Sequence, residues 1–163
     1  MANATFYLLQ GLLGDKQDGA SADDSGLAAK AQRFYCEQIA ELYRQYRQIN
    51  VWTASQQAAE ALDEALWKLP VDAFIPHNLQ GEGPANGAPV EIQWPQSDNR
   101  SPRRSRVLVN LSEQVPPHAQ QTQVIVDFVP LADSGKQQAR ERYKQYRAWG
   151  MQMQSTPASL IEN

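Results

Sequence analysis

Five side chains near the end of the sequence have types and spacing that suit an acidic ligand. Lys136, Arg140, Lys144 and Arg147 recur at intervals of three or four residues, and Tyr143 stands among them. In a helix, all five would share a stripe about 100° wide. Guanidinium and ammonium groups bind carboxylates, and a tyrosine beside them offers an apolar contact. The pattern is typical of a site for an acidic peptide with an apolar end; a charged helical face that meets only water is the alternative.

A second candidate is the glycine-rich segment QGEGPANG, which resembles a phosphate-binding loop. The dinucleotide fingerprint G-x-G-x-x-G opens into a helix, whose N-terminal N–H groups hold the phosphate. Here Gly81 and Gly83 are followed by Gly87 one residue late, and Pro84 removes a backbone donor. A strand pattern follows instead of a helix, with no Lys-Ser or Lys-Thr pair. We interpret the segment as a surface loop and keep a nucleotide-binding α/β domain using Gly81 to Gly87 as the alternative function.

The remaining reactive side chains do not form a catalytic set. His77 and His118 are far apart in sequence and lack the companions of a zinc site. Asp63 and Glu64 are adjacent, so on a helix they point about 100° apart and cannot act as a paired acid and base. The single cysteine, Cys36, falls within a helical pattern and is expected to be buried. We therefore expect no catalytic residue, no metal and no cofactor, and expect His77 to hydrogen-bond through one ring nitrogen.

Charge is unevenly distributed along the chain. The net charge is −3, which does not favour general binding to nucleic acid. Residues 1–99 carry 13 acidic and 6 basic side chains, whereas residues 100–163 carry 5 acidic and 9 basic ones. One polar loop of the basic part contains four arginines, Arg100, Arg103, Arg104 and Arg106. Arginines can contact phosphates, but no aromatic side chain lies near to stack on bases, so we favour a solvated loop that does not bind DNA directly.

Alternating strands and helices must position these residues. Apolar, β-rich runs predict strands at Thr5–Leu9, Ile49–Thr53, Val90–Trp94, Arg106–Leu111 and Gln123–Val129. Helical periodicity predicts helices from Leu27 to Tyr46, from a Ser55 cap to Pro70, and over Ser134–Trp149. Strand and helix in alternation predict an α/β fold.

The length of 163 residues favours one domain. We expect that domain to occupy residues 1–150, with a polar surface loop at residues 14–26. Residues 151–163 carry no periodic pattern and are expected to form a flexible C-terminal tail. The sequence shows no membrane span and no leader pattern, and its one cysteine fits a reducing compartment, so we expect a cytoplasmic protein.

Several long segments resemble one protein family. They are NATFYLL near the N-terminus, LDEALW, FIPHNLQGEGPANGAPVEIQWPQ, VDFVP and ARERYKQYR. These ordered motifs are similar to those of the chi subunits of bacterial DNA polymerase III holoenzyme. The resemblance covers Asp63 to Gln96 and Val126 to Gly150 besides the first strand. It is weak over residues 10–50 and 97–123.

The resemblance implies a single three-layer Rossmann-like domain with a mixed, mostly parallel sheet flanked by helices. It also implies a non-catalytic accessory subunit of the clamp-loader complex, which binds the psi subunit and the acidic C-terminal tail of single-stranded DNA-binding protein. The family's tail site matches Arg140, Tyr143, Lys144 and Arg147 within and after the motif RERYK, beside Val129. The psi-facing aromatic residue matches Phe74.

Overall fold

The computed structural model describes residues 2–13, 24–70, 73–82, 88–95, 103 and 105–160. These residues contain the strands β1 Asn3–Leu8, β2 Ile49–Trp52, β3 His77–Leu79, β4 Val90–Gln93, β5 Val107–Asn110, β6 Val124–Val129 and β7 Gln152–Pro157. The helices are α1 Asp24–Tyr46, α2 Gln56–Lys68 and α3 Asp133–Ala148, with short 3₁₀ turns η1 Leu9–Leu13 and η2 Ala119–Gln121. The predicted strands and helices are therefore present, with ends that differ by at most three residues.

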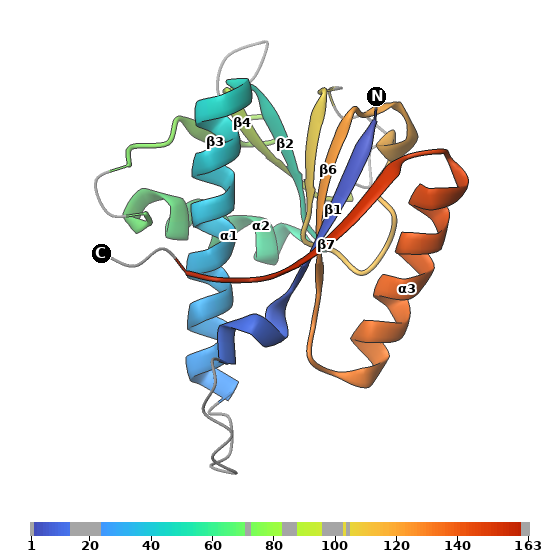
Figure 1. Ribbon diagram of the computed structural model, residues 1–163. Helices are drawn as coiled ribbons and strands as arrows, with labels where there is room; N and C mark the ends of the chain where they lie inside the picture. The colour runs from blue at the N-terminus through green and yellow to red at the C-terminus, as the bar shows by residue number, and fades with distance from the viewer. Residues whose placement is uncertain are drawn as a thin grey trace.

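The strands form one sheet in the order β3-β4-β2-β5-β6-β1-β7. Helices α1 and α2 lie on one side of this sheet and α3 lies on the other (Figure 1). This arrangement confirms the predicted single three-layer α/β domain. Every strand pairing in the described residues is parallel, so the antiparallel component of the expected mixed sheet is not found there.

Alternate residues of the strands feed two apolar cores, one on each face of the sheet. The core beneath α1 and α2 contains the fully buried side chains Phe34, Ile39, Val51 and Ile92. The core beneath α3 is smaller, and its largest fully buried side chain is Tyr146 of the helix itself. Burial of an apolar stripe, rather than helix propensity, holds such helices in place.

Helix α2 shows how the sequence sets an element's ends. The Ser55 hydroxyl accepts a hydrogen bond from the Ala58 N–H at 3.1 Å, as an N-cap does. The helix ends at Lys68, two residues before Pro70, which cannot continue it. Asp63 and Trp67 thereby lie one turn apart near its C-terminal end.

The expectation of a flexible tail is wrong for β7. Gln152–Pro157 pair in parallel with Asn3–Leu8, and Ala158 donates its N–H to the Leu8 carbonyl at 2.9 Å. Gly11 permits the close approach that follows, because a Cβ atom there would lie 2.4 Å from the Ala158 carbonyl oxygen. Residues 161–163 lie outside the described part of the chain.

Arg103 is not a solvated loop residue, contrary to the sequence interpretation. Its Nε lies 2.8 Å from Oε2 of Glu91 and 2.7 Å from Oδ1 of Asn50. Its guanidinium also donates to the carbonyls of Ile49 and Ala88. Arg103 therefore ties together the first residues of β2 and β4, and burial lowers its pKa while the nearby carboxylate raises it.

Other expectations concern residues that the structure does not describe. These are residues 14–23 of the polar loop, residues 83–87 of the glycine segment, and Arg100 and Arg104. The loop was predicted to extend to residue 26, but residues 24–26 belong to the first turn of α1. Arg106 is described, and its Nε donates to Oε1 of Gln123 at 3.0 Å on the surface.

Candidate functional site

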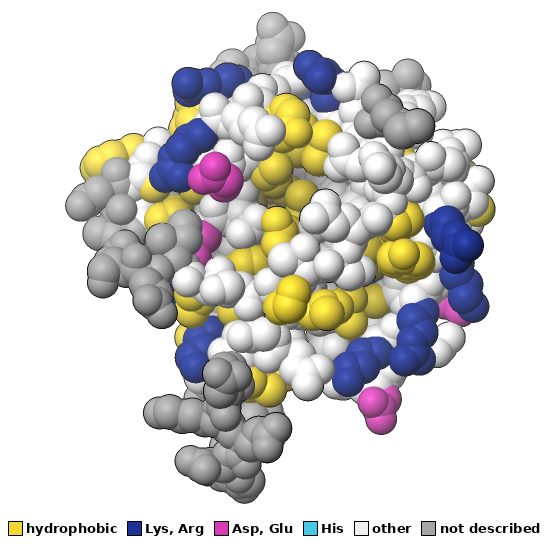
Figure 2. Space-filling model, in the orientation of Figure 1, with side chains coloured by type: hydrophobic (Ala, Val, Ile, Leu, Met, Phe, Trp, Pro, Cys, Tyr) yellow, Lys and Arg dark blue, Asp and Glu magenta, His cyan; other side chains and the backbone are white. Residues whose placement is uncertain are grey.

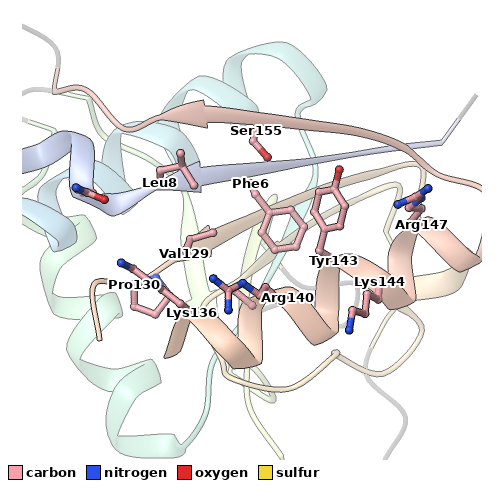
Figure 3. A pocket seen from close by; sticks show the side chains of 12 residues that line it. Phe6, Leu8, Val129, Pro130, Lys136, Arg140, Tyr143, Lys144, Arg147 and Ser155 are labelled. Atoms are coloured by element: carbon pink, nitrogen blue, oxygen red, sulfur yellow. The ribbon is translucent and has the colours of Figure 1, made fainter. Parts of the chain in front are cut away.

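A groove of about 490 Å³ lies between α3 and the C-terminal ends of β1 and β6, with β7 at its border. Its lining residues are Phe6, Leu8, Gln10, Val129, Pro130, Lys136, Ala139, Arg140, Tyr143, Lys144, Arg147 and Ser155. Figure 3 shows β7 along one side of this groove and α3 along the other, with side chains from both directed into the space between them. We call it the α3 groove.

The floor of the α3 groove is apolar. Leu8 of β1 stands in register with Val129 of β6, and the two side chains form one part of the floor. Phe6 forms another part, and its ring centroid lies 5.5 Å from that of Tyr143 on α3. Ser155 is the register partner of Phe6 on β7 and adds a hydroxyl to the border. The groove can therefore receive an apolar side chain.

The rim of the α3 groove is basic. Lys136, Arg140, Lys144 and Arg147 project along it from α3 (Figure 3). Figure 2 shows Lys and Arg side chains along the α3 side of the molecule, with hydrophobic surface inward of them. The ammonium group of Lys144 lies 3.7 Å from Glu141, and both side chains are well exposed, so this pair leaves Lys144 open to other carboxylates. The sequence-based stripe did not include this acidic neighbour.

All five residues assigned to a peptide site from the sequence line the α3 groove. They are Val129, Arg140, Tyr143, Lys144 and Arg147. The structure brings them together with Lys136, the remaining member of the helical stripe. Sequence reasoning missed Phe6, Leu8, Gln10, Pro130 and Ser155, which come from other strands and loops. The alternation of Phe6 and Leu8 toward one face was the available signal for two of them.

A buried ion pair fixes the orientation of α3. The Arg142 guanidinium donates to both carboxylate oxygens of Asp127 on β6, at 3.0 and 3.1 Å. Tyr146 donates its hydroxyl to the same carboxylate at 2.8 Å, and Asn110 donates to it at 3.1 Å. Burial, and then the Asp127 charge, raise the pKa of Tyr146 well above its usual range. Arg142, within the RERYK motif, therefore faces the interior and turns its neighbours toward the groove.

Gly135 sets the end of the groove near the start of α3. A Cβ atom at this position would lie 2.3 Å from Cγ of Pro130, so only glycine allows the first turn of α3 to pack against that ring. Pro130, one partner in this contact, and Lys136, the residue after Gly135, both line the groove.

Two exposed aromatic side chains lie outside the α3 groove. Phe74 is 87% exposed and Trp67 is 73% exposed, and they are the large hydrophobic side chains that stand out on the surface of the described residues. Phe74 lies outside the strands, and its exposure shows that it is not a core residue. Its φ of 50° lies in the left-handed region, which is uncommon for a residue with a side chain.

The glycine segment does not lead into a helix. Gly81 has a φ of +86° in the turn after β3, and β4 begins at Val90, as the strand pattern predicted. The helix N-terminus that a dinucleotide loop needs is thus not at the end of this segment. Residues 83–87 themselves lie outside the described part.

His77 and Asp63, mentioned above for catalysis, lie on β3 and α2 and face each other inside the fold. Among the residues that the structure describes, no three His, Cys, Asp or Glu side chains gather in a way that could hold a metal ion.

Among the described residues, none of the helices combines the length and apolar character that crossing a membrane requires.

Comparison with known proteins agrees with the sequence motifs. The family model described as "DNA polymerase III chi subunit, HolC" matches residues 1–154. The chain is 44% identical to the DNA polymerase III subunit chi of Escherichia coli (strain K12), over 94% of this chain and 96% of that protein. It is 37% identical to the subunit of the same name from Haemophilus influenzae, over 71% of this chain and 78% of the relative. The chain belongs to the family of DNA polymerase III chi subunits.

Proposed function

We propose that the protein is a non-catalytic accessory subunit of the clamp-loader complex that links the psi subunit to single-stranded DNA-binding protein. Family membership makes it a subunit of DNA polymerase III. The link has two ends, and each end corresponds to one of the two surfaces described above. The α3 groove takes the acidic C-terminal tail of single-stranded DNA-binding protein, and the surface around Phe74 takes psi.

The observation that carries the proposal is the combination of charge and apolar floor in the α3 groove. Lys136, Arg140, Lys144 and Arg147 line a groove whose floor is made by side chains such as Leu8 and Val129. An acidic tail with an apolar end and a free α-carboxylate needs cations beside a pocket of this kind. The volume of about 490 Å³ suits one or two side chains rather than a folded domain.

The surface around Phe74 suits a partner that buries aromatic anchors. Aromatic side chains are enriched in protein–protein interfaces relative to the rest of the surface. Trp67 and Phe74 are both aromatic, and buried aromatic anchors contribute much of the binding free energy of protein–protein interfaces. The family resemblance assigns the psi contact to the position of Phe74.

Isothermal titration calorimetry tests the proposal with a peptide that ends in an acidic and apolar run, such as DDDIPF, and with purified psi. We expect both to bind, and to bind together, because the two sets of residues are separate. A peptide of the same composition in scrambled order is the control. Binding of ATP or NAD with no binding of the peptide would contradict the proposal and favour the nucleotide-binding alternative.

A further inference from the structure

We propose that His77 is held as a positively charged imidazolium that positions the Phe74 loop, and that psi binding therefore weakens as pH rises. The Phe74 loop denotes the described residues 73–76, which directly precede β3. The link to psi rests on the proposed function of Phe74. The structural part of the inference concerns this chain alone and can be tested without a partner.

Both ring nitrogens of His77 face oxygen acceptors. Nδ1 lies 2.6 Å from the carbonyl oxygen of Ile75. Nε2 lies 3.1 Å from the carbonyl oxygen of Asp63 and 3.3 Å from its carboxylate Oδ1. A neutral imidazole donates from one nitrogen and carries a lone pair on the other, so one of these contacts would oppose two lone pairs. The imidazolium donates from both nitrogens and satisfies all three oxygens.

The surroundings of His77 can hold a charge. Its side chain is 0% exposed, and a buried charge needs a partner of opposite sign. On α2, the Asp63 carboxylate supplies that partner. Trp67 follows Asp63 by one turn, and its ring centroid lies 4.7 Å from that of His77, where an aromatic ring favours a cation.

Other charged groups of the neighbouring elements are engaged elsewhere. On α2, Glu64 pairs with Lys68 at 3.7 Å. On β4, the register partner of His77 is Val90, and Glu91 pairs with Arg103 at 2.8 Å. Among the described groups, Asp63 is thus the carboxylate that faces the imidazole within ion-pair distance.

His77 connects this charge to the partner surface through the backbone of the Phe74 loop. The Ile75 carbonyl that accepts the Nδ1–H belongs to the residue directly after Phe74. Ile75 is itself buried, whereas Phe74 is exposed with a left-handed φ of 50°. That conformation is unfavourable for a residue with a Cβ, so neighbouring contacts must hold it. The His77 hydrogen bond and the burial of Ile75 supply them.

Loss of the proton removes one donor and the attraction to Asp63. Either the Ile75 or the Asp63 carbonyl then loses its partner, and the Phe74 loop is no longer held in one conformation. Histidine is the side chain whose charge responds to pH near neutrality, so pH is the variable that tests this contact. Hydrogen bonds from charged donors are the stronger class, and loss of one corresponds to about tenfold weaker psi binding.

The first experiment is a pH titration of the uniformly ¹⁵N-labelled protein by NMR. The chain has two histidines, so His118→Gln assigns the ring signals. We expect both ring nitrogens of His77 to be protonated at the acidic end of the range. As that ring loses a proton, the Phe74 amide and the Trp67 indole signals should shift with the same midpoint. A His77 ring that keeps one unprotonated nitrogen from pH 5.5 upward, or a Phe74 amide that ignores the His77 titration, would overturn the inference.

The second experiment measures psi affinity from pH 5.5 to 9 for three proteins. We expect about a tenfold loss for the wild type and for His118→Gln, and no such trend for His77→Gln, whose amide cannot change charge. An equal trend in all three would assign the pH dependence to psi and contradict the inference. If psi does not bind at any pH, the proposed function fails while the NMR titration still decides the state of His77. The wild-type titration also stands if His77→Gln does not fold.

Discussion

The rings of Phe6 and Tyr143 lie 5.5 Å apart, centroid to centroid, and join β1 to α3 at the floor of the α3 groove. This contact places an apolar surface beside a row of cations that all come from one side of α3. The groove thus combines a fixed floor with exposed charges, and the two can be tested separately by substitution.

The first prediction concerns the cations. Lys144→Ala or Arg140→Ala should weaken binding of the acidic tail peptide about tenfold or more, because hydrogen bonds to charged groups contribute about 1.5–3 kcal/mol each. The affinity of the wild type should also fall as salt rises, since the charges are exposed. Stability should change by no more than about 0.5 kcal/mol. Calorimetric titration and thermal melting measure the two quantities.

Lys68→Ala is a matched control for this prediction. Lys68 is 73% exposed and lies 3.7 Å from Glu64, whereas Lys144 is 72% exposed and lies 3.7 Å from Glu141. The two lysines differ in that only Lys144 lines the α3 groove. If Lys144→Ala and Lys68→Ala bind the peptide as tightly as the wild type, the face of α3 is merely solvated.

The second prediction concerns Phe74. Because this side chain is 87% exposed, Phe74→Ala should leave the melting temperature nearly unchanged. Psi binding should lose about 2 kcal/mol or more, as at central aromatic anchors. Unaltered psi affinity in a fully folded variant would rule out Phe74 as the anchor. Peptide binding in the α3 groove serves as the internal control.

The third prediction concerns the buried pair beneath α3. Arg142→Ala should lower the free energy of unfolding by about 3–5 kcal/mol, because it leaves the Asp127 carboxylate buried without its charged partner. Tyr146→Phe removes one hydrogen bond to the same carboxylate and should cost about 1.5–3 kcal/mol. Urea denaturation measures both. A stability loss in Arg142→Ala as small as that of an exposed substitution would show that the pair does not hold α3.

The fourth prediction follows from buried groups that resist ionisation. Burial raises the pKa of the Cys36 thiol from 9.0 to about 12, and that of the Tyr35 phenol from 10.0 to about 12. The unfolded chain therefore releases these protons first as pH rises. The stability that they contribute is complete below pH 9 and is lost as pH rises from 9 to 12. Urea midpoints should fall accordingly, and by a smaller amount in Cys36→Ala; midpoints that are level up to pH 11 would contradict this.

The fifth prediction concerns β7. A chain that ends at Gly150 should lose about 3 kcal/mol or more, because the backbone hydrogen bonds to β1 and the buried side chains of Met151 and Ala158 are removed. It should also bind the tail peptide more weakly, since Ser155 lines the groove. A chain that ends at Leu160 keeps β7 and is the control. Equal stability of the two truncated chains would mean that β7 adds nothing to the fold.

Periodicity in the sequence predicted most of the sheet and all three helices. The central strands bury both faces, so their apolar runs are unmistakable. β7 was not predicted, because it is an edge strand whose Gln, Ser and Thr side chains do not alternate with apolar ones. Its place depends on backbone pairing with β1, which leaves no pattern in side-chain type.

Some residues of the candidate site could likewise be predicted from the sequence, and others could not. Arg140, Tyr143, Lys144 and Arg147 could be grouped from the sequence because helical spacing alone brings them together. Ser155 and Phe6 are almost 150 residues apart, and only the sheet makes them neighbours. Arg103 was misinterpreted for a similar reason, since its partner Asn50 comes from a strand 53 residues earlier.

The position of β1 between β6 and β7 has a consequence for synthesis on the ribosome. β1 is made before both of its neighbours in the sheet, which lie more than 100 residues later, in residues 124–129 and 152–157. Until those residues leave the exit tunnel, both edges of β1 remain without their native partners. Contacts of such large sequence separation slow folding and expose unpaired edges to other chains. The newly made protein therefore completes its sheet only after translation has passed β7, and depends on protection from aggregation until then.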